Sequence, residues 1–546
     1  MLQGADDSRR SRLEFLTLAL VHGVVIDPDN MPLDMVCVNT PAVLRRLDMC
    51  KERLKHYDDI GALEHLSEKP ALLQPLHVVV RENKKDRLVI DLSRNLNDEL
   101  STPQFNLPHF REAVALSSPC CWYGKMDLSD CFLSFDIHPD SRRYLAFELD
   151  GKFYRWKRLP FGLSSSPYWC EEFLGVIDFA LRAQLPKHVR HLRYVDDYLF
   201  ISDSRAGITD AFAIARRVLA AHGLRVNEAK TEGPLQRIIF LGLGLDSTLQ
   251  ESWVPEDKLD ECRNLLKKSL KQIQVDGRLL VRKDVQSLVG KLSFISAVLP
   301  GARPFFRALI THSSRLPSRF SPLVCSADLV PDLDMWLHIL RHWTTGSCKW
   351  PSDEPEVEFV HDACRESDVG GFGFYIKDLP PGMVLHLPHE LTPGHGFAGD
   401  FDVTGELLAN SIQWAELFAI AYCLTLYGPY LRGRAVLLWS DNMADVCIIN
   451  RQDTRCPALR ALLRAIYSTA AHYHIRIRAR HIKGKENTLA DLLSRAEYHL
   501  HRERACVDDK YTDIHYIVRS SWSPPKQAHL PAKVVFKLGG PCRKSS

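Results

Sequence analysis

The segment His191-Leu-Arg-Tyr-Val-Asp-Asp-Tyr-Leu-Phe-Ile-Ser202 is the one around which the other motifs of this chain can be ordered. Apolar and β-branched residues lead up to Asp196-Asp197 and resume directly after them, which predicts a hairpin with two carboxylates at its turn. Asp is a common turn residue, so an ordinary Asp-Asp turn is the simpler explanation of the pair alone. Two like charges about 4 Å apart nevertheless repel by roughly 4 kcal/mol in a surface-like dielectric, and a divalent cation would remove that cost.

The composition is that of a folded protein with several domains. Of the 546 residues, 45% are hydrophobic and 25% are charged, and the net charge is only +3. Nucleic-acid binding would therefore depend on local basic patches. Fifteen cysteines occur without a CxxC pair, which favours reduced thiols and an intracellular location, in the cytoplasm, the nucleus or both. The apolar run 15–26 is too short to span a membrane and lacks an obvious signal-peptide cleavage site, so we expect an amphipathic or buried helix there.

Hydrophobic patterns predict an α+β region, then a helical region. Ser166 as N-cap, with Pro167 at the first helical position, is expected to start a helix that runs to about residue 185. The other elements expected in the first region are strands at 76–80, 88–90, 123–127 and 238–245, a hairpin at 147–156 that turns at Asp150-Gly151, and a helix at 208–222. Residues 255–345 are expected to be largely helical, and 351–355 to be a linker.

From residue 357 a second α/β pattern begins. The expected strands are 357–360, 370–376, 436–439 and 475–479, and the expected helices are 413–426 and 458–472. Residues 1–70 are expected to be mixed helix and loop without recognisable chemistry. The last 45 or so residues are expected to be a tail.

Asp127 ends the predicted strand 123–127. It is either a turn residue or a third carboxylate beside Asp196 and Asp197. Three carboxylates at strand ends can hold two Mg²⁺ ions, one to activate a primer 3′-hydroxyl and one to bind the triphosphate. A third carboxylate at this position would thus predict nucleotidyl transfer.

Five short motifs occur in the order in which reverse transcriptases carry them, and the chain resembles that family. The motifs are Lys125-Met-Asp-Leu-Ser-Asp-Cys-Phe132, Leu159-Pro-Phe-Gly-Leu-Ser-Ser-Ser-Pro167, Tyr194-Val-Asp-Asp197, Gly223-Leu-Arg-Val-Asn-Glu-Ala-Lys230 and Phe240-Leu-Gly242. Leu288-Val-Gly-Lys-Leu292 and Leu489-Ala-Asp-Leu-Leu-Ser-Arg495 look most like the DIRS-type, gypsy-related retrotransposons.

The resemblance implies roles for individual residues. Asp127, Asp196 and Asp197 match the metal-binding carboxylates. Phe132 matches the aromatic residue that excludes a 2′-hydroxyl, although core burial would also explain it. Arg81 and Arg87 match residues that would bind the triphosphate. Phe161 and Gly162 belong to the motif whose backbone approaches template and nucleotide. Lys230 would protonate pyrophosphate or be a surface lysine.

Four more carboxylates are spread over the last third of the chain. Glu416 lies on an apolar face of the expected helix 413–426, where an unpaired carboxylate is costly and a salt bridge would satisfy it. Asp362 ends the strand that begins at 357. Asp441 follows the strand 436–439 and could instead cap the next helix, and Asp491 could be merely a first-turn helix acid.

Taken with Gly370-Gly-Phe-Gly-Phe374, these carboxylates resemble the four-carboxylate site of ribonuclease H. The resemblance implies two-metal hydrolysis of an RNA phosphodiester by water. His481 would help product release, or would be a hydrogen-bonded surface histidine. A basic strand face suited to phosphate contact is formed by Arg476, Arg478 and Arg480, which alternate with apolar residues.

We therefore expect an α+β multidomain chain: a right-hand polymerase (fingers, palm, thumb, connection) followed by an α/β ribonuclease H-like domain. The expected boundaries are a lead segment 1–70, fingers and palm 71–250, thumb and connection 251–350, ribonuclease H 351–500 and a tail 501–546. The expected activity is that of a retrotransposon RNA-directed DNA polymerase that also degrades the RNA of the hybrid. Its partners would be an RNA template, a DNA primer, the RNA–DNA hybrid, dNTPs and two Mg²⁺ (or Mn²⁺) per site.

Two other functions are compatible with parts of the chain. An RNA-dependent RNA polymerase shares the palm chemistry, but Phe132 and the second acidic site argue against it. A co-opted or decayed retroelement protein would bind nucleic acid without catalysis. The presence of all seven carboxylates weighs against decay without excluding it.

Overall fold

The computed structural model describes residues 2–30, 36–80, 86–93, 95–274, 280–299, 301–314, 322–323, 329–342, 347–350, 357–366, 369–377, 395–402, 412–495 and 513–517. The chain divides into two compact units, 1–241 with 245–250, and 242–244 with 251–546. Both contain helices and sheets, so the predicted α+β multidomain class is confirmed. Among the described helices, none is both long and apolar enough to span a bilayer.

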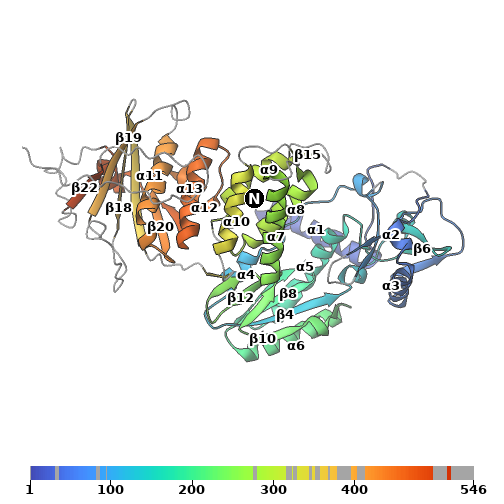
Figure 1. The fold of residues 1–546 in the computed structure, drawn as a ribbon. Helices are drawn as coiled ribbons and strands as arrows, with labels where there is room; N and C mark the ends of the chain where they lie inside the picture. Colours follow the sequence, from blue (N-terminus) through green and yellow to red (C-terminus); the bar gives the residue numbers. More distant parts are fainter. Residues whose placement is uncertain are drawn as a thin grey trace, which may run out of the picture. The chain divides into compact units, whose positions relative to one another are not determined.

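The predicted hairpin forms one side of the main sheet of the first unit. β7 (Val189–Tyr194) and β8 (Asp197–Ser202) are its antiparallel strands. β4 (Trp122–Ser129) pairs with β8, and β10 (Glu232–Leu235) pairs with β4, which gives the order β10-β4-β8-β7 (Figure 1). The short strand β9 (Arg225–Val226) adds to the C-terminal end of β4.

Two helices pack in the core of this unit, α5 (Ser166–Gln184) and α6 (Arg205–Ala221). A glycine on β4 lets α6 approach the sheet. A Cβ at Gly124 would lie 2.5 Å from Ile208 Cγ2 and 2.6 Å from the Phe212 ring, closer than atoms can pack. The glycine before the Lys-Met-Asp motif thus holds the acidic end of β4 against its supporting helix.

One capping prediction is wrong. Ser165, not Ser166, is the N-cap of α5, and its side chain makes no capping bond. Ser166 lies inside the helix and is buried, and its hydroxyl donates to the Pro160 carbonyl at 3.0 Å. The Ser166 side chain therefore makes a hydrogen bond within the Leu159–Pro167 motif instead of capping the helix.

The expected single strand at 238–245 is two strands, β11 (Arg237–Phe240) and β12 (Leu243–Asp246). Leu241 and Gly242 between them have φ angles of 50° and 78°, which end an extended strand. The run of apolar residues predicts one strand here, because Gly242 is the only one of the two residues at the break whose type suggests it.

The expected helix at 15–26 is the last part of a longer helix, α1 (Leu2–His22). It buries Leu16 and Ala19 but exposes Leu13, Phe15 and Leu18, so the expectation of an amphipathic or buried helix is wrong for this segment. Val24 has left the helix and bridges to Ile137. The other elements of the unit are α2 (Pro41–Leu44), α3 (Leu47–Asp59), α4 (Phe110–Leu116), the sheet β1-β6-β5 (Leu63–Leu66, Lys152–Trp156, Ala146–Leu149) and the hairpin β2-β3 (Leu76–Val79, Arg87–Ile90).

The second unit begins with the predicted helical region. Its helices are α7 (Glu256–Gln274), α8 (Arg282–Ile295), α9 (Arg307–Ser314) and α10 (Leu329–His342). Strand β13 (Glu251–Trp253) pairs antiparallel with β16 (Ser347–Lys349), and β14 (Leu280–Val281) with β15 (Pro322–Leu323). The expected linker at 351–355 lies outside the described residues.

A mixed six-stranded sheet follows. β17 (Val357–Glu366), β18 (Val369–Ile376) and β19 (His395–Asp402) are antiparallel neighbours. On the other side of β17, β20 (Ala435–Ser440) and β21 (Arg476–His481) run parallel to it. The order is β21-β20-β17-β18-β19-β22. Four of these strands, β18, β19, β20 and β22, are labelled in Figure 1. The outermost strand, β22 (Asp513–Ile517), lies in the stretch expected to be a tail and runs parallel to β19.

Four helices accompany this sheet: α11 (Ile412–Tyr427), α12 (Met443–Arg451), α13 (Pro457–Tyr473) and α14 (Thr488–Ser494). α11 packs against β17, β18 and α13, and it is buried on almost every side. α14 packs against β17, β18 and β19 through Ala490 and Leu493, which join a cluster with Val360 and Tyr375. The catalytic candidates lie where these helices meet β17 and β20.

Candidate active sites

The sheet of the first unit brings three predicted carboxylates together. Asp127 on β4 is paired in register with Asp197, the first residue of β8, and Asp196 stands in the turn just before it. Val195, next to them in the turn, has a φ of 51°, a strained value for a β-branched residue. Antiparallel pairing of β4 with β8 therefore places Asp127 beside Asp196 and Asp197, a proximity that the spacing of these residues in the sequence could not show.

The environment of these carboxylates opposes their ionisation. Burial raises the pKa of Asp197 to about 6, with further contributions from the charges of Asp196 and Asp127. Burial, followed by the charge of Asp127, also raises the pKa of Asp196. Clustered carboxylates whose ionisation is disfavoured are the arrangement that a bound divalent cation stabilises.

Lys230 lies at this cluster. Its Nζ is 2.9 Å from Asp127 Oδ1 and 3.0 Å from Oδ2, while its side chain stays 62% exposed. Asn227 Nδ2 donates to the same Oδ1 at 3.3 Å. The Lys230 ammonium group thus offsets part of the negative charge of the cluster from the side of Asp127.

The aromatic and basic residues predicted for nucleotide binding also converge. The Phe132 and Phe161 rings lie 5.3 Å apart, and the Arg87 guanidinium lies 5.5 Å above the Phe161 ring. Phe132 is partly buried and packs on the edge of the core, so core packing explains only part of its position. Arg81 lies outside the described residues.

Gly162 needs to be glycine for two reasons. Its φ is 118°, and a Cβ would lie 1.8 Å from the Ile90 carbonyl oxygen. Asn97, which belongs to none of the sequence motifs, spans the same loop. Its Nδ2 donates to the Gly162 carbonyl at 2.9 Å, and its Oδ1 accepts from the Ser164 amide at 2.9 Å. Asn97 and Gly162 also line a cavity of about 230 Å³ that includes Asp91 and Ser93.

The hairpin is supported from behind by one ion pair and one hydrogen bond, both made by residues outside the five motifs. Arg193 on β7 contacts Glu171 on α5 at 2.7 Å, and His191 Nε2 lies 2.7 Å from Asp178 Oδ1 on the same helix. All four side chains are largely buried. They hold the Asp196-Asp197 turn at a defined position relative to α5.

A second group of carboxylates forms in the other unit. Asp362 on β17, Glu416 on α11 and Asp441 after β20 each offer an oxygen within 4.8 Å of the others. Burial raises the pKa of Glu416 to about 8, with a further contribution from Asp441. Burial raises that of Asp362 to about 7, with a further contribution from Glu416.

A salt bridge does not satisfy Glu416. Its nearest basic group is His361, whose Nδ1 lies 3.4 Å from Glu416 Oε2, but burial lowers the pKa of His361 to about 4, so the ring is neutral at pH 7. Within the described part of the chain, Glu416 Oε2 has no hydrogen-bond partner. A buried oxygen without a donor, beside two more carboxylates, fits a divalent cation.

The structure excludes the helix-capping role considered for Asp441 but shows the first-turn position considered for Asp491. Asn442, not Asp441, caps α12, because its side chain accepts from the Ala444 amide. Asp491 does lie in the first turn of α14, where it accepts from Arg495 Nε at 2.9 Å, and it is not within the close group of three. His481 is exposed, with Nε2 3.1 Å from the Asp441 carbonyl.

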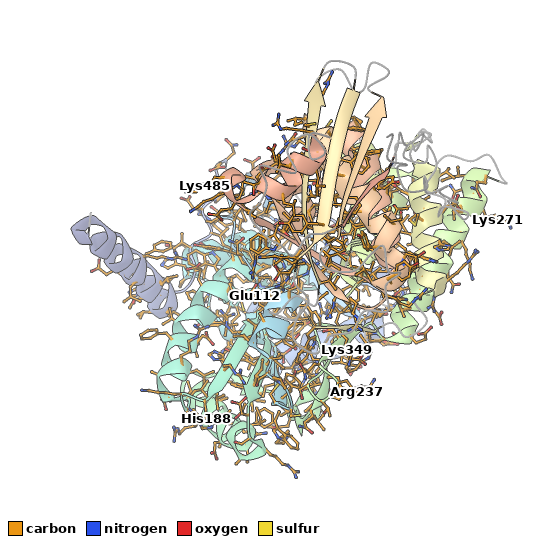
Figure 2. The ribbon with its side chains drawn as sticks, turned by 90° about the vertical axis from the view of Figure 1, so that its left-hand side faces the viewer. Glu112, His188, Arg237, Lys271, Lys349 and Lys485 are labelled. Atoms are coloured by element: carbon orange, nitrogen blue, oxygen red, sulfur yellow. The ribbon has the colours of Figure 1, made fainter. Side chains whose placement is uncertain are left out.

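Basic residues border the second group. Arg478 and Arg480 are exposed on β21, whereas Arg476 is partly buried and donates to the Trp350 carbonyl at 2.6 Å. The turn after β21 contains Lys485, labelled in Figure 2. A Cβ on its neighbour Gly484 would lie 3.5 Å from Asp441 Oδ2, so this basic turn borders the carboxylates directly.

Two residues of this region could not be identified from the sequence. Ser494 Oγ donates to Asp362 Oδ2 at 2.6 Å. Asp445 on α12 is fully buried, and burial followed by the charges of Glu416 and Asp441 raises its pKa to about 8. In the sequence Ser494 is only one position of the Leu489–Arg495 motif, and an Asp four residues after Asp441 gives no sign of burial until α12 is placed.

Comparison with known proteins identifies relatives of residues 80–245 and of longer parts of the chain. Residues 80–245 match the family described as reverse transcriptase (RNA-dependent DNA polymerase). The chain is 26% identical over 424 residues to an enzymatic polyprotein of Cassava vein mosaic virus, covering 75% of this chain and 58% of that one. It is 26% identical over 316 residues to the Gag-Pro-Pol polyprotein of Mouse mammary tumor virus (strain BR6), covering 53% of this chain and 17% of that one.

A solved foamy viral protease-reverse transcriptase in complex with dsDNA is similar at 17% identity and a TM-score of 0.49, over 84% of this chain and 87% of that one. The chain spans 58% of the length of the Cassava vein mosaic virus polyprotein and 17% of that of the Mouse mammary tumor virus polyprotein. It therefore covers less than two thirds of each of these two relatives. The family match includes β4 and the β7–β8 hairpin, with all three carboxylates of the first group. Residues 80–245 are a reverse transcriptase domain with homologues in viral polyproteins.

Proposed function

We propose that this chain is an RNA-directed DNA polymerase with a fused ribonuclease H, encoded by a DIRS-type retrotransposon. The observation that carries the proposal is the presence of two distinct carboxylate groups, Asp127–Asp196–Asp197 in one unit and Asp362–Glu416–Asp441 in the other. The retrotransposon subclass is supported only by the motif resemblance. The proposed domain boundaries are 71–250 for fingers and palm, 251–350 for thumb and connection, and 351–500 for ribonuclease H.

Each carboxylate group would hold Mg²⁺ or Mn²⁺, two ions per site. Bound there, the cations would lower the pKa of the attacking hydroxyl or water and offset charge on the phosphate. In the polymerase centre, the pair Phe132–Phe161 would carry the nucleotide sugar, Arg87 would contact the triphosphate, and Lys230 would donate a proton to the leaving pyrophosphate.

In the second centre, Asp491 would complete the set of four carboxylates. α14, which carries it, is held by its packing on β17 and β18. The exposed Arg478 and Arg480 on β21, with the basic turn at 483–485, would contact the phosphate backbone of an RNA–DNA hybrid. The second group of carboxylates is also the feature that an RNA-dependent RNA polymerase would not need.

The experiment is a separation of the two activities in the full chain. Asp196→Asn with Asp197→Asn should abolish primer extension with dNTPs on an RNA template but leave cleavage of a preformed RNA–DNA hybrid. Glu416→Gln should do the reverse. Both changes are isosteric, so each removes negative charge without altering packing.

The outcomes separate the proposal from its rivals. Loss of both activities in either variant would contradict separable sites. Binding of the hybrid without extension or cleavage by the unaltered chain would indicate a nucleic-acid-binding protein without catalysis. Efficient extension with NTPs would indicate an RNA polymerase.

A further inference from the structure

Ser494, the last residue of α14, makes a direct contact with the second carboxylate group. It is 1% exposed, and its hydroxyl donates to Asp362 Oδ2 at 2.6 Å, a distance typical of a bond to a charged acceptor. The same oxygen lies 2.9 Å from the Asp491 carbonyl one turn earlier. A hydroxyl has a single proton, so the bond to the carboxylate is the one it can make strongly.

The position of Ser494 is determined by backbone packing. A Cβ at Gly371 would lie 1.8 Å from the Ser494 carbonyl oxygen, and one at Gly373 would lie 2.3 Å from Leu493 Cβ. Cys364 on β17 donates its thiol to the Ser494 carbonyl at 2.9 Å. The glycines of the Gly-Gly-Phe-Gly-Phe motif therefore form the flat strip on which the end of α14 lies.

Asp362 needs such a donor. It is buried, and burial together with the charge of Glu416 disfavours its ionised form. The Ser494 hydrogen bond acts in the opposite direction and favours the charged carboxylate. It also leaves Oδ1 of Asp362 as the oxygen not engaged by Ser494.

We propose that Ser494 is a positioning residue of the second carboxylate group. Its hydroxyl fixes Asp362 in the orientation that a divalent cation requires, and it links that orientation to the docking of α14, the helix that carries Asp491. This inference rests on the proposed ribonuclease H centre.

The test measures Mn²⁺ binding to the full chain by electron paramagnetic resonance. Asp196→Asn with Asp197→Asn is the reference background, so that the signal reports the second centre. Hydrogen-bond partners of metal ligands typically contribute 10- to 100-fold in metal affinity, and we expect Ser494→Ala to raise the Mn²⁺ Kd by about that factor. Ser494→Thr keeps the hydroxyl and should restore affinity to within about threefold of the reference.

Ser468→Ala is the matched control, since Ser468 is also a buried helical serine but contacts Met335 instead of a carboxylate. Its Kd should not change. Equal affinity in Ser494→Ala and the reference would overturn the inference, as would a Ser494→Thr protein that binds no better than Ser494→Ala. If the reference bound no Mn²⁺, or still bound it after Asp362→Asn, the proposed centre itself would be wrong.

Discussion

Replacing Asp445 should stabilise the metal-free protein, although the residue lies next to a proposed active site. Asp445 is in the first turn of α12 and is 0% exposed, and neither of its carboxylate oxygens has a hydrogen-bond partner among the described residues. Burial, then the charges of Glu416 and Asp441, raises its pKa to about 8 from an ordinary value of 3.8. In the unfolded chain the group would titrate near the ordinary value.

The direction of the pH effect on the free energy of unfolding depends on whether the folded or the unfolded state binds the proton of Asp445. Between pH 3.8 and 8 the unfolded chain has an ionised Asp445 while the folded chain keeps it protonated, so stability is lost as pH rises through this window. At about 1.4 kcal/mol per pH unit, the loss at pH 7 is about 4 kcal/mol. An asparagine does not titrate, but a buried amide without partners costs about 1–3 kcal/mol. The net gain expected for Asp445→Asn at pH 7 is therefore about 1–3 kcal/mol.

Hydrogen exchange of the α12 amides in the full chain, in EDTA, measures this locally. The opening free energy of Asp445→Asn relative to the unaltered protein should grow by about 3 kcal/mol between pH 5 and pH 7. Asp445→Leu leaves no unpaired amide and should stabilise further. A difference that stays constant with pH, or destabilisation by both substitutions at pH 7, would refute the reasoning.

Two further predictions concern the polymerase centre. Phe132→Val should lower the preference for dNTPs over NTPs in primer extension by roughly tenfold, because a smaller side chain leaves room for a 2′-hydroxyl; an unchanged preference would count against the gate. Asn97→Ala removes both hydrogen bonds to the loop of Gly162 and should lower kcat/KM for dNTP incorporation about tenfold while hybrid cleavage stays unchanged. The control is Asn95→Ala, since the Asn95 side chain accepts from the adjacent Leu96 amide instead of bonding the Gly162 loop, and equal losses in both variants would contradict a specific role for Asn97.

Local features were predictable where the determining residues are neighbours in sequence. The β7–β8 hairpin follows from the apolar and β-branched residues on both sides of Asp196-Asp197, and the turn of the β5–β6 hairpin follows from Asp150-Gly151. The predictions failed where a distant contact decides a local question. Ser166 is drawn inside α5 by the Pro160 carbonyl, and β22 extends a sheet from a stretch whose composition indicates a tail.

The sequence by itself determined the order of the motifs, the resemblance to reverse transcriptases and the identity of the candidate carboxylates, because each depends on residues close together in the chain. Only the tertiary structure decided how they are used. Pairing of β4 with β8 places Asp127 beside Asp197, and three separate elements bring Asp362, Glu416 and Asp441 within 4.8 Å. Burial that removes water from Asp445, and the docking that points Ser494 at Asp362, are also long-range effects. The desolvation and charge repulsion that shift the pKa values of these sites arise only between groups that the fold brings together.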